Sequence, residues 1–308
     1  MKEEQPKVSD STRIRYTNTA YGILHRYRKD TQTEWKEDLD KFVDWIFDLL
    51  ADKQPPTRRQ YRCALREVLQ NDAPPWFFAK LDAIHTMASP APKKKNRTRK
   101  SIKEKDLLKL QRKAVECGSK WARIGVSWLT VCMLVGVRPS ELWGAQLLDG
   151  KLKVPNGKYT EGGQRSFGSH RTLHLRLDEA EIEIIEKFLE TVPQEETLEH
   201  AQKIAQQALR RLQMRLWPKR KTFYALYSGR HQCVADAKAS GLTLIEIAAL
   251  AGHAATKTAQ VHYGRRTAGR ASGGAFRVMP SESDIRAVAE INGVSLQEEP
   301  AGNTSPRG

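Results

Sequence analysis

The 308 residues are enough for two ordinary domains, and a chain with 39% hydrophobic and 29% charged residues is typical of a folded protein with buried cores. Its 52 Lys and Arg exceed its 36 Asp and Glu, so a formal charge of +16 favours a polyanionic partner, with nucleic acid ahead of an anionic membrane. The chain shows no uninterrupted apolar run of membrane-spanning length and no apolar signal core near its start, which argues against a membrane protein and predicts a cytoplasmic location.

Cysteine usage and short motifs limit the chemistry further. Four cysteines lie far apart, with no CxxC pair, so reduced and buried thiols are expected rather than disulfides. Neither an HExxH motif nor a phosphate-binding P-loop is present. We therefore expect no metal ion and no cofactor.

Residues 1–88 are predicted to form a small all-helical module. Leu39, Phe42, Ile46 and Leu50 recur at helical spacing in one segment. After a Pro-Pro pair, the next segment places its apolar residues on one helical face and its arginines largely on others. That arginine face is either a phosphate-binding surface or an ordinary solvated helix face, and its candidate contacts are Arg58, Arg59 and Arg62.

Residues 89–103 are predicted to form a basic linker between domains. The stretch combines prolines with a dense basic run and lacks apolar periodicity. It could follow a nucleic-acid backbone, or it could be a sequence of the nuclear-localisation type or a plain soluble tether. The basic residues concerned are Lys93, Lys94, Lys95, Arg97 and Arg99.

Residues 104–270 are predicted to form a second, α-rich domain with a small antiparallel sheet. The run WARIGVSWLTVCMLVG is apolar almost all round, which is typical of a central buried helix that ends at Gly136. Short alternating runs around Leu152 and Leu173 then indicate strands separated by Gly-rich turns. Further helices follow, one of which carries Arg210 on a basic face that could lie on phosphates. Residues 271–308 are predicted to form a tail with one short amphipathic segment.

Two stretches of this domain contain residue types suited to phosphodiester chemistry without a metal. That chemistry needs positive hydrogen-bond donors around the nonbridging oxygens, a nucleophile in line and an acid for the leaving oxygen. Arginine suits the first task because its planar guanidinium matches phosphate and stays charged. The stretches are GVRPSEL at 136–142 and YSGRHQCVADAKASGLTLIEIAALAGHAATKTAQVHYGRR at 227–266.

In the order and spacing of these residues the chain resembles the tyrosine recombinases, the family that includes phage-type integrases. The resemblance extends over roughly residues 11–270 and implies a mainly α fold, with a SAM-like helical core-binding domain before the catalytic domain. It implies that Arg138 and Arg230 bind the scissile phosphate, that Glu141 orients Arg138, and that Tyr263 is the nucleophile. The remaining roles that it implies fall on Lys158 as general acid and on Tyr227 and His253 as phosphate contacts. Arg265, which follows the expected nucleophile, could either contact backbone phosphates or hold the nucleophile helix.

Two positions depart from the family pattern. Tyr227 stands where histidine is commonest, which weakens a proton-shuttling role because tyrosine has a pKa near 10. Tyr263 follows His253 by ten positions, one more than is commonest, so that His262 falls in the usual place of the nucleophile. We expect Tyr263 to be the nucleophile all the same, since it lies on the same predicted helix.

The resemblance implies site-specific recombination of double-stranded DNA through a 3′-phosphotyrosine link, for a mobile element in a bacterial nucleoid. It also implies dimers and tetramers on DNA, accessory DNA-bending proteins, and a tail that packs on a neighbouring protomer. A DNA-binding accessory protein that keeps the fold without the reaction is the alternative. A metal-dependent nuclease is a third reading, but the sequence offers no convincing acidic triad for it.

Overall fold

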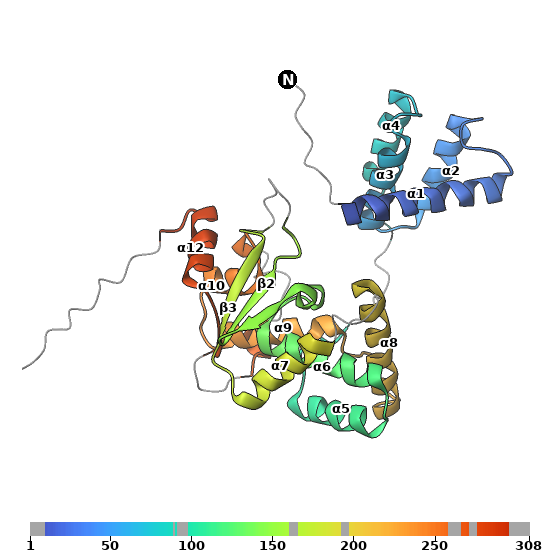
Figure 1. Ribbon diagram of the computed structural model, residues 1–308. Coiled ribbons are helices and arrows are strands. Elements are labelled where there is room, and N and C mark those ends of the chain that lie inside the picture. The colour runs from blue at the N-terminus through green and yellow to red at the C-terminus, as the bar shows by residue number, and fades with distance from the viewer. Residues whose placement is uncertain are drawn as a thin grey trace, which may run out of the picture. The chain divides into compact units, whose positions relative to one another are not determined.

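The computed structural model describes residues 10–88, 90, 98–159, 166–191, 197–257, 266–270 and 276–295. The chain divides into two compact units, Met1–Lys95 and Asn96–Gly308. Both are mainly helical, and the second contains one antiparallel sheet, as Figure 1 shows. The mainly α fold with a small antiparallel sheet that the sequence predicted is therefore confirmed. Among the helices in the described ranges, none has the length and apolar character needed to span a bilayer.

The first unit is a bundle of short helices around an aromatic core. Phe42 stacks on Phe77 with ring centroids 5.9 Å apart, and Tyr27 meets Phe42 edge-on at 4.8 Å. Asp38 accepts a hydrogen bond from the backbone N–H of Lys41 and so caps a helix N-terminus. The elements are α1 (Asp10–Thr31), α2 (Leu39–Ala51), α3 (Pro55–Leu69), α4 (Pro75–Asp82) and the 3₁₀ turn η1 (Ala83–Thr86).

The second unit is built around the buried helix α6, and four other helices in the described part of the unit pack on it. The N-cap of α6 is Ser119, and the helix ends at Gly136, whose φ of +72° is a left-handed conformation that favours glycine. The helices are α5 (Glu104–Glu116), α6 (Lys120–Val135), α7 (Glu179–Thr191), α8 (Leu198–Leu216), α9 (Leu226–Ala239), α10 (Leu244–Ala251) and α12 (Glu282–Ile291), with 3₁₀ turns η2 (Pro139–Gly144) and η4 (Arg266–Ala268).

The sheet has the strand order β1-β2-β3-β4, and every pair is antiparallel. Leu152 and Leu173 face each other across β2 and β3 and are fully buried, as the alternation in the sequence predicted. Arg171 has the same inward phase as Leu173 and is also buried. The strands are β1 (Gln146–Leu148), β2 (Lys151–Pro155), β3 (His170–Leu175) and β4 (Val278–Pro280).

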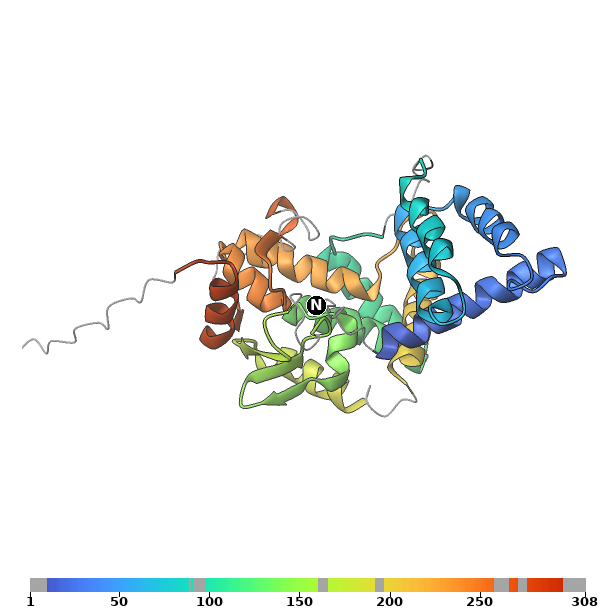
Figure 2. The same cartoon turned by 90° about the horizontal axis from the view of Figure 1, so that it is seen from above.

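Residues 276–295 pack against their own chain. Val278 pairs with Leu175 as β4 joins the sheet, and Val288 of α12 packs in a small cluster with Ala248 and Ala249 of α10. Figure 2 shows α12 beside α10 from a second direction. The apolar residues of 276–295 thus complete this unit's own sheet and helix layer, and the amphipathic segment expected in the tail is α12.

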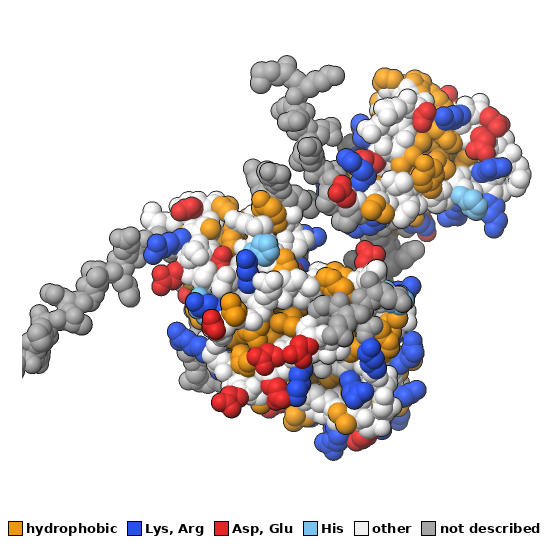
Figure 3. All heavy atoms as spheres, viewed as in Figure 1, with side chains coloured by type: hydrophobic (Ala, Val, Ile, Leu, Met, Phe, Trp, Pro, Cys, Tyr) orange, Lys and Arg blue, Asp and Glu red, His pale blue; other side chains and the backbone are white. Residues whose placement is uncertain are grey.

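The face seen in Figure 3 carries both basic and acidic side chains. Figure 3 shows Lys and Arg on both units, together with a group of acidic side chains on one face of the second. The net charge of +16 therefore coexists with locally acidic surface. Particular arginines have to be judged by their contacts rather than by the total charge.

Candidate active site

Glu141 lies at the centre of the residues that the motifs single out. It is 1% exposed, and its Oε2 accepts a hydrogen bond of 2.8 Å from the backbone N–H of Arg138, which caps η2. Its Oε1 accepts from the Arg138 side chain and, at 3.2 Å, from the N–H of Gly157. The predicted pairing of Glu141 with Arg138 is present, and it reaches the turn after β2 as well.

Arg230 approaches Glu141 from α9. Its Nη1 lies 3.7 Å from Oε2 of Glu141 and donates to the carbonyl of Gly136 at 3.0 Å. The neighbouring Gly229 lets α9 lie close to α6, because a Cβ there would be only 2.4 Å from the carbonyl oxygen of Leu129. Close helix packing at one glycine thus brings an arginine from a distant part of the sequence to the centre of the unit.

His253 follows the left-handed end of α10 at Gly252 and is 4% exposed. Its Nε2 lies 3.1 Å from Nη2 of Arg230. A guanidinium can only donate, so this Nε2 is the acceptor and the neutral ring carries its proton on Nδ1. Burial, followed by the charges of Arg230, Arg138 and Arg171, lowers the pKa of His253 to about 2, which agrees with a neutral imidazole.

Arg171, which the motifs did not indicate, joins this cluster from β3. It is fully buried, and it donates to Oε2 of Glu141 at 2.8 Å and to the carbonyl of Leu250 at 3.0 Å. Its third hydrogen bond goes to Oδ1 of Asn156 in the turn after β2. The sequence did contain a signal for this residue. Arg171 lies two positions before Leu173 and so on the same inward face of the strand, and a charge on an inward face needs a partner.

The cluster formed by Arg138, Glu141, Arg171, Arg230 and His253, called here the arginine cluster, has an excess of positive charge. Burial by itself would raise the pKa of Glu141, but Arg171, Arg230 and Arg138 outweigh it and lower that pKa to about 2. Three guanidinium charges less one carboxylate leave two positive charges. An enclosed excess of this kind favours an anion, and the fork geometry of arginine suits phosphate oxygens.

Two predicted residues lie at the edge of the arginine cluster. Lys158 is exposed in the turn after β2, next to Gly157, whose N–H contacts Glu141. Tyr227 is 37% exposed in the first turn of α9, and its ring centre is 6.0 Å from the guanidinium carbon of Arg230. Both therefore lie beside the arginine cluster.

Other predicted residues fall outside the described residues. The expected nucleophile Tyr263 is one, and the neighbouring His262 and Arg265 are others. The same holds for most of the predicted linker contacts, namely Lys93, Lys94, Lys95 and Arg97.

The described DNA-binding candidates differ in their surroundings. Arg59 and Arg210 are exposed, whereas Arg62 lies 3.7 Å from Asp82 and Arg99 lies 3.6 Å from Asp106 in ion pairs. Arg58 does not fit the surface role expected from the sequence.

Arg58 is 3% exposed because its guanidinium holds helix ends together. It donates to the carbonyls of Leu50 and Ala51 at the end of α2, at 3.0 and 2.9 Å. It also donates to the carbonyls of Met87 and Ala88, at 2.9 and 3.0 Å. These four acceptors occupy the side chain, so its role is structural.

Comparison with known proteins bears on the fold. No protein-family model matches the chain, and no curated protein matches its sequence. Among solved structures, the fold is similar to a lambda integrase dimer bound to a COC′ core site, with a TM-score of 0.56 and 14% identity over 84% of this chain and 73% of that one. A lambda integrase tetramer bound to a Holliday junction gives a TM-score of 0.55 and 14% identity, over 85% of this chain and 74% of the other.

Proposed function

We propose that this chain, which has the tyrosine recombinase fold, is a site-specific recombinase that cleaves and rejoins DNA. The observation that carries the proposal is the arginine cluster, with its two excess positive charges and its neutral histidine. Arg138 and Arg230, which the motifs single out, both contact Glu141 in it. A protein that only binds DNA needs basic surface but no buried arrangement of this kind.

In the proposed reaction, the hydroxyl of Tyr263 attacks a phosphodiester whose nonbridging oxygens are bound by Arg138 and Arg230. A tyrosine–phosphate bond forms, and the bond to the leaving 5′ oxygen breaks. The arginines stabilise the charge that develops on phosphorus-bound oxygens, and loss of one such donor typically costs a factor of about 10²–10³ in rate. Attack by a 5′ hydroxyl of a partner strand reverses the chemistry and releases the tyrosine.

The proton movements have candidate groups nearby. A bound phosphate would offset the arginine charges that help to lower the pKa of His253 and would replace Nε2 as the acceptor for Arg230, so that His253 could then accept the proton of the attacking hydroxyl. Lys158 is the proposed acid for the leaving oxygen, since it lies in the turn that also contacts Glu141. Arg171 contacts Glu141 rather than substrate, so it is a positioning residue.

The nucleophile is tested by trapping the covalent intermediate. Nicked duplexes, selected beforehand from random sequence for binding, are incubated with protein in EDTA, and an adduct stable in SDS is sought. We expect the adduct with wild type, with His262→Ala and with Tyr227→Phe, and none with Tyr263→Phe. Equal binding by wild type and Tyr263→Phe without any adduct would favour the accessory protein, the alternative that Tyr227 and the displaced Tyr263 support. Cleavage that requires a divalent metal would favour the nuclease.

The acid is tested separately with a substrate whose leaving 5′ oxygen is replaced by sulfur. A thiolate leaves without protonation, because a thiol is far more acidic than an alcohol. Lys158→Ala is therefore expected to cleave the oxygen substrate slowly and the sulfur substrate at the wild-type rate. A Lys158→Ala protein that is equally slow on both substrates has lost a backbone contact instead of an acid.

Strand exchange requires more than one protomer. Because the similar lambda integrase structures are a dimer on a core site and a tetramer on a Holliday junction, we extend the proposal to dimers and tetramers on paired DNA sites. Integration, excision or resolution of a mobile element, assisted by DNA-bending proteins, is the proposed biological task. Light scattering with and without a selected duplex measures the assembly.

A further inference from the structure

A small pocket lies at the N-terminal end of α9, outside the arginine cluster. Its volume is about 130 Å³, well below the roughly 300–1,000 Å³ of pockets that enclose a whole small molecule. Gln206 and Arg210 of α8 line one side, residues 221–225 line the other, and Thr98 contributes at its edge. The pocket is thus the size of a single small group.

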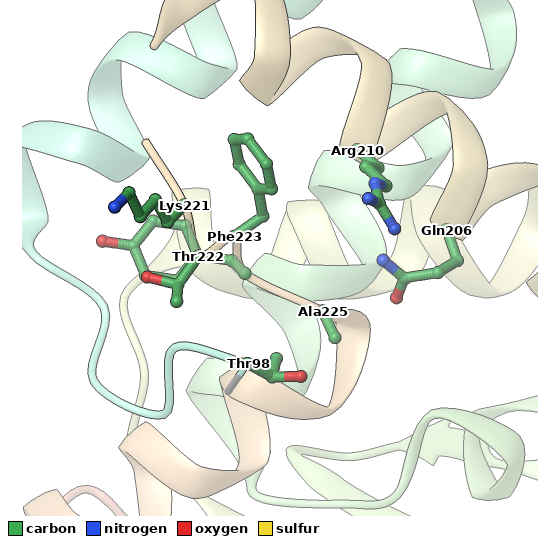
Figure 4. A pocket seen from close by; sticks show the side chains of 8 residues that line it. Thr98, Gln206, Arg210, Lys221, Thr222, Phe223 and Ala225 are labelled. Carbon is green, nitrogen blue, oxygen red and sulfur yellow. The ribbon is translucent and has the colours of Figure 1, made fainter. Parts of the chain in front are cut away.

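The pocket offers hydrogen-bond donors and no acidic side chain. Oε1 of Gln206 accepts the backbone N–H of Leu226 at 2.8 Å, which fixes the amide so that its NH₂ group is free to face the pocket. Figure 4 shows the ends of Gln206 and Arg210 extended toward one another, with Lys221 on the far side of Phe223. Within the described part of the chain, no carboxylate forms an ion pair with Arg210 or Lys221.

The wall that faces these donors is rigid. The N–H of Tyr224 donates to Gln213 at 2.7 Å, and its carbonyl accepts from the same side chain at 2.9 Å. The Tyr224 hydroxyl donates to the buried Asp106 at 2.7 Å. The N–H of Arg99 donates to the carbonyl of Phe223 at 3.0 Å and ties the first described residues of the unit to the same wall. A pocket held in this way is preorganised for its ligand.

We infer that this pocket binds a second backbone phosphate of DNA, separate from the phosphate at the arginine cluster. A guanidinium, an amide NH₂ and the positive end of the α9 dipole converge there, and each favours a small anion. The pocket lies at the N-terminus of α9, the helix that carries Arg230, so this one helix would contact both phosphates. The inference rests on the proposed function only in taking DNA as the source of the phosphate.

The test uses a pair of substitutions that add the same charge one residue apart. Gln206→Glu keeps the oxygen that accepts from Leu226 but replaces the donor with a carboxylate. Gln207→Glu adds a carboxylate on an exposed neighbour that does not line the pocket. Binding to a mixed-sequence duplex is measured over a range of salt concentrations, with Arg210→Ala as a third variant.

We expect Gln206→Glu and Arg210→Ala to raise Kd about tenfold. They should also reduce the magnitude of the slope of log K against log[salt] by about 0.9, the contribution of one phosphate contact. Gln207→Glu should leave that slope unchanged. Equal effects of Gln206→Glu and Gln207→Glu would overturn the inference, as would a wild-type chain that binds no duplex. Cleavage is measured separately, as the covalent adduct formed at saturating protein. If no adduct forms but the salt slopes are as predicted, the proposed recombinase function is wrong while the phosphate-binding pocket is supported.

Discussion

Gly252→Ala should destabilise the second unit more than the same change at another left-handed glycine. Gly252 has a φ of +64°, and a Cβ there would lie 2.6 Å from Oδ1 of Asn156 and 2.7 Å from Nη1 of Arg171. Neither group can move away easily, because Arg171 also holds Glu141 at 2.8 Å. The left-handed backbone costs alanine about 1–2 kcal/mol, and the overpacking adds about 1–3 kcal/mol.

Gly118→Ala is the matched control for this prediction. Gly118 has the same φ of +64°, but nothing lies within 4 Å of its Cβ position. It should therefore show the backbone cost alone. At about 2–4 °C per kcal/mol, the Tm of Gly252→Ala should fall below that of Gly118→Ala by about 2–12 °C in a thermal melt. Equal Tm values for the two variants would refute the packing of Gly252 against the arginine cluster.

Four further predictions concern buried charges. His253, with a folded pKa of about 2 against an ordinary 6.5, resists the proton that the unfolded chain takes up, so stability should fall by up to about 1.4 kcal/mol per pH unit below pH 6.5. Glu141, with a folded pKa of about 2 against 4.5, should add a second loss of stability below pH 4.5. Urea unfolding at several pH values measures both losses. If the stability of His253→Gln falls as steeply below pH 6.5 as that of wild type, the prediction for His253 is wrong. Arg58→Ala should lower the free energy of unfolding of the first unit by about 3 kcal/mol and the exposed Arg59→Ala by less than about 0.5 kcal/mol, so similar urea midpoints would contradict the structural role of Arg58. Arg171→Met should cost about 3–5 kcal/mol and slow adduct formation, and an unchanged adduct rate would show that Arg171 does not position Arg138 through Glu141.

Part of the candidate site could be predicted because it depends on local spacing. Arg138 and Glu141 are three positions apart, about one turn of a 3₁₀ helix, so a cap and an ion pair between them are expected from the sequence alone. Gly136 and Gly252 end helices in the left-handed conformation, which also has a local signature. The sequence therefore predicted the end of the buried helix at Gly136, where α6 does end.

Other parts of the site depend on contacts between distant segments. The partners of Arg171 are Glu141, Asn156 and the carbonyl of Leu250, which are separated from it by up to 79 positions. Arg58 looked like its neighbour Arg59 in the sequence, yet its guanidinium reaches carbonyls 30 positions away. Helical periodicity assigns a residue to a face but does not say which backbone acceptors another segment brings to that face.

From the sequence alone one obtains a basic, mainly helical chain whose motifs predict phosphate chemistry at particular arginines. It takes the folded chain to show that three guanidiniums surround Glu141, that His253 is neutral, and that residues 276–295 complete the sheet of their own unit. The physical reason is that composition, periodicity and capping act over a few neighbouring residues. Burial and the balance of charge depend on which distant segments share the same interior.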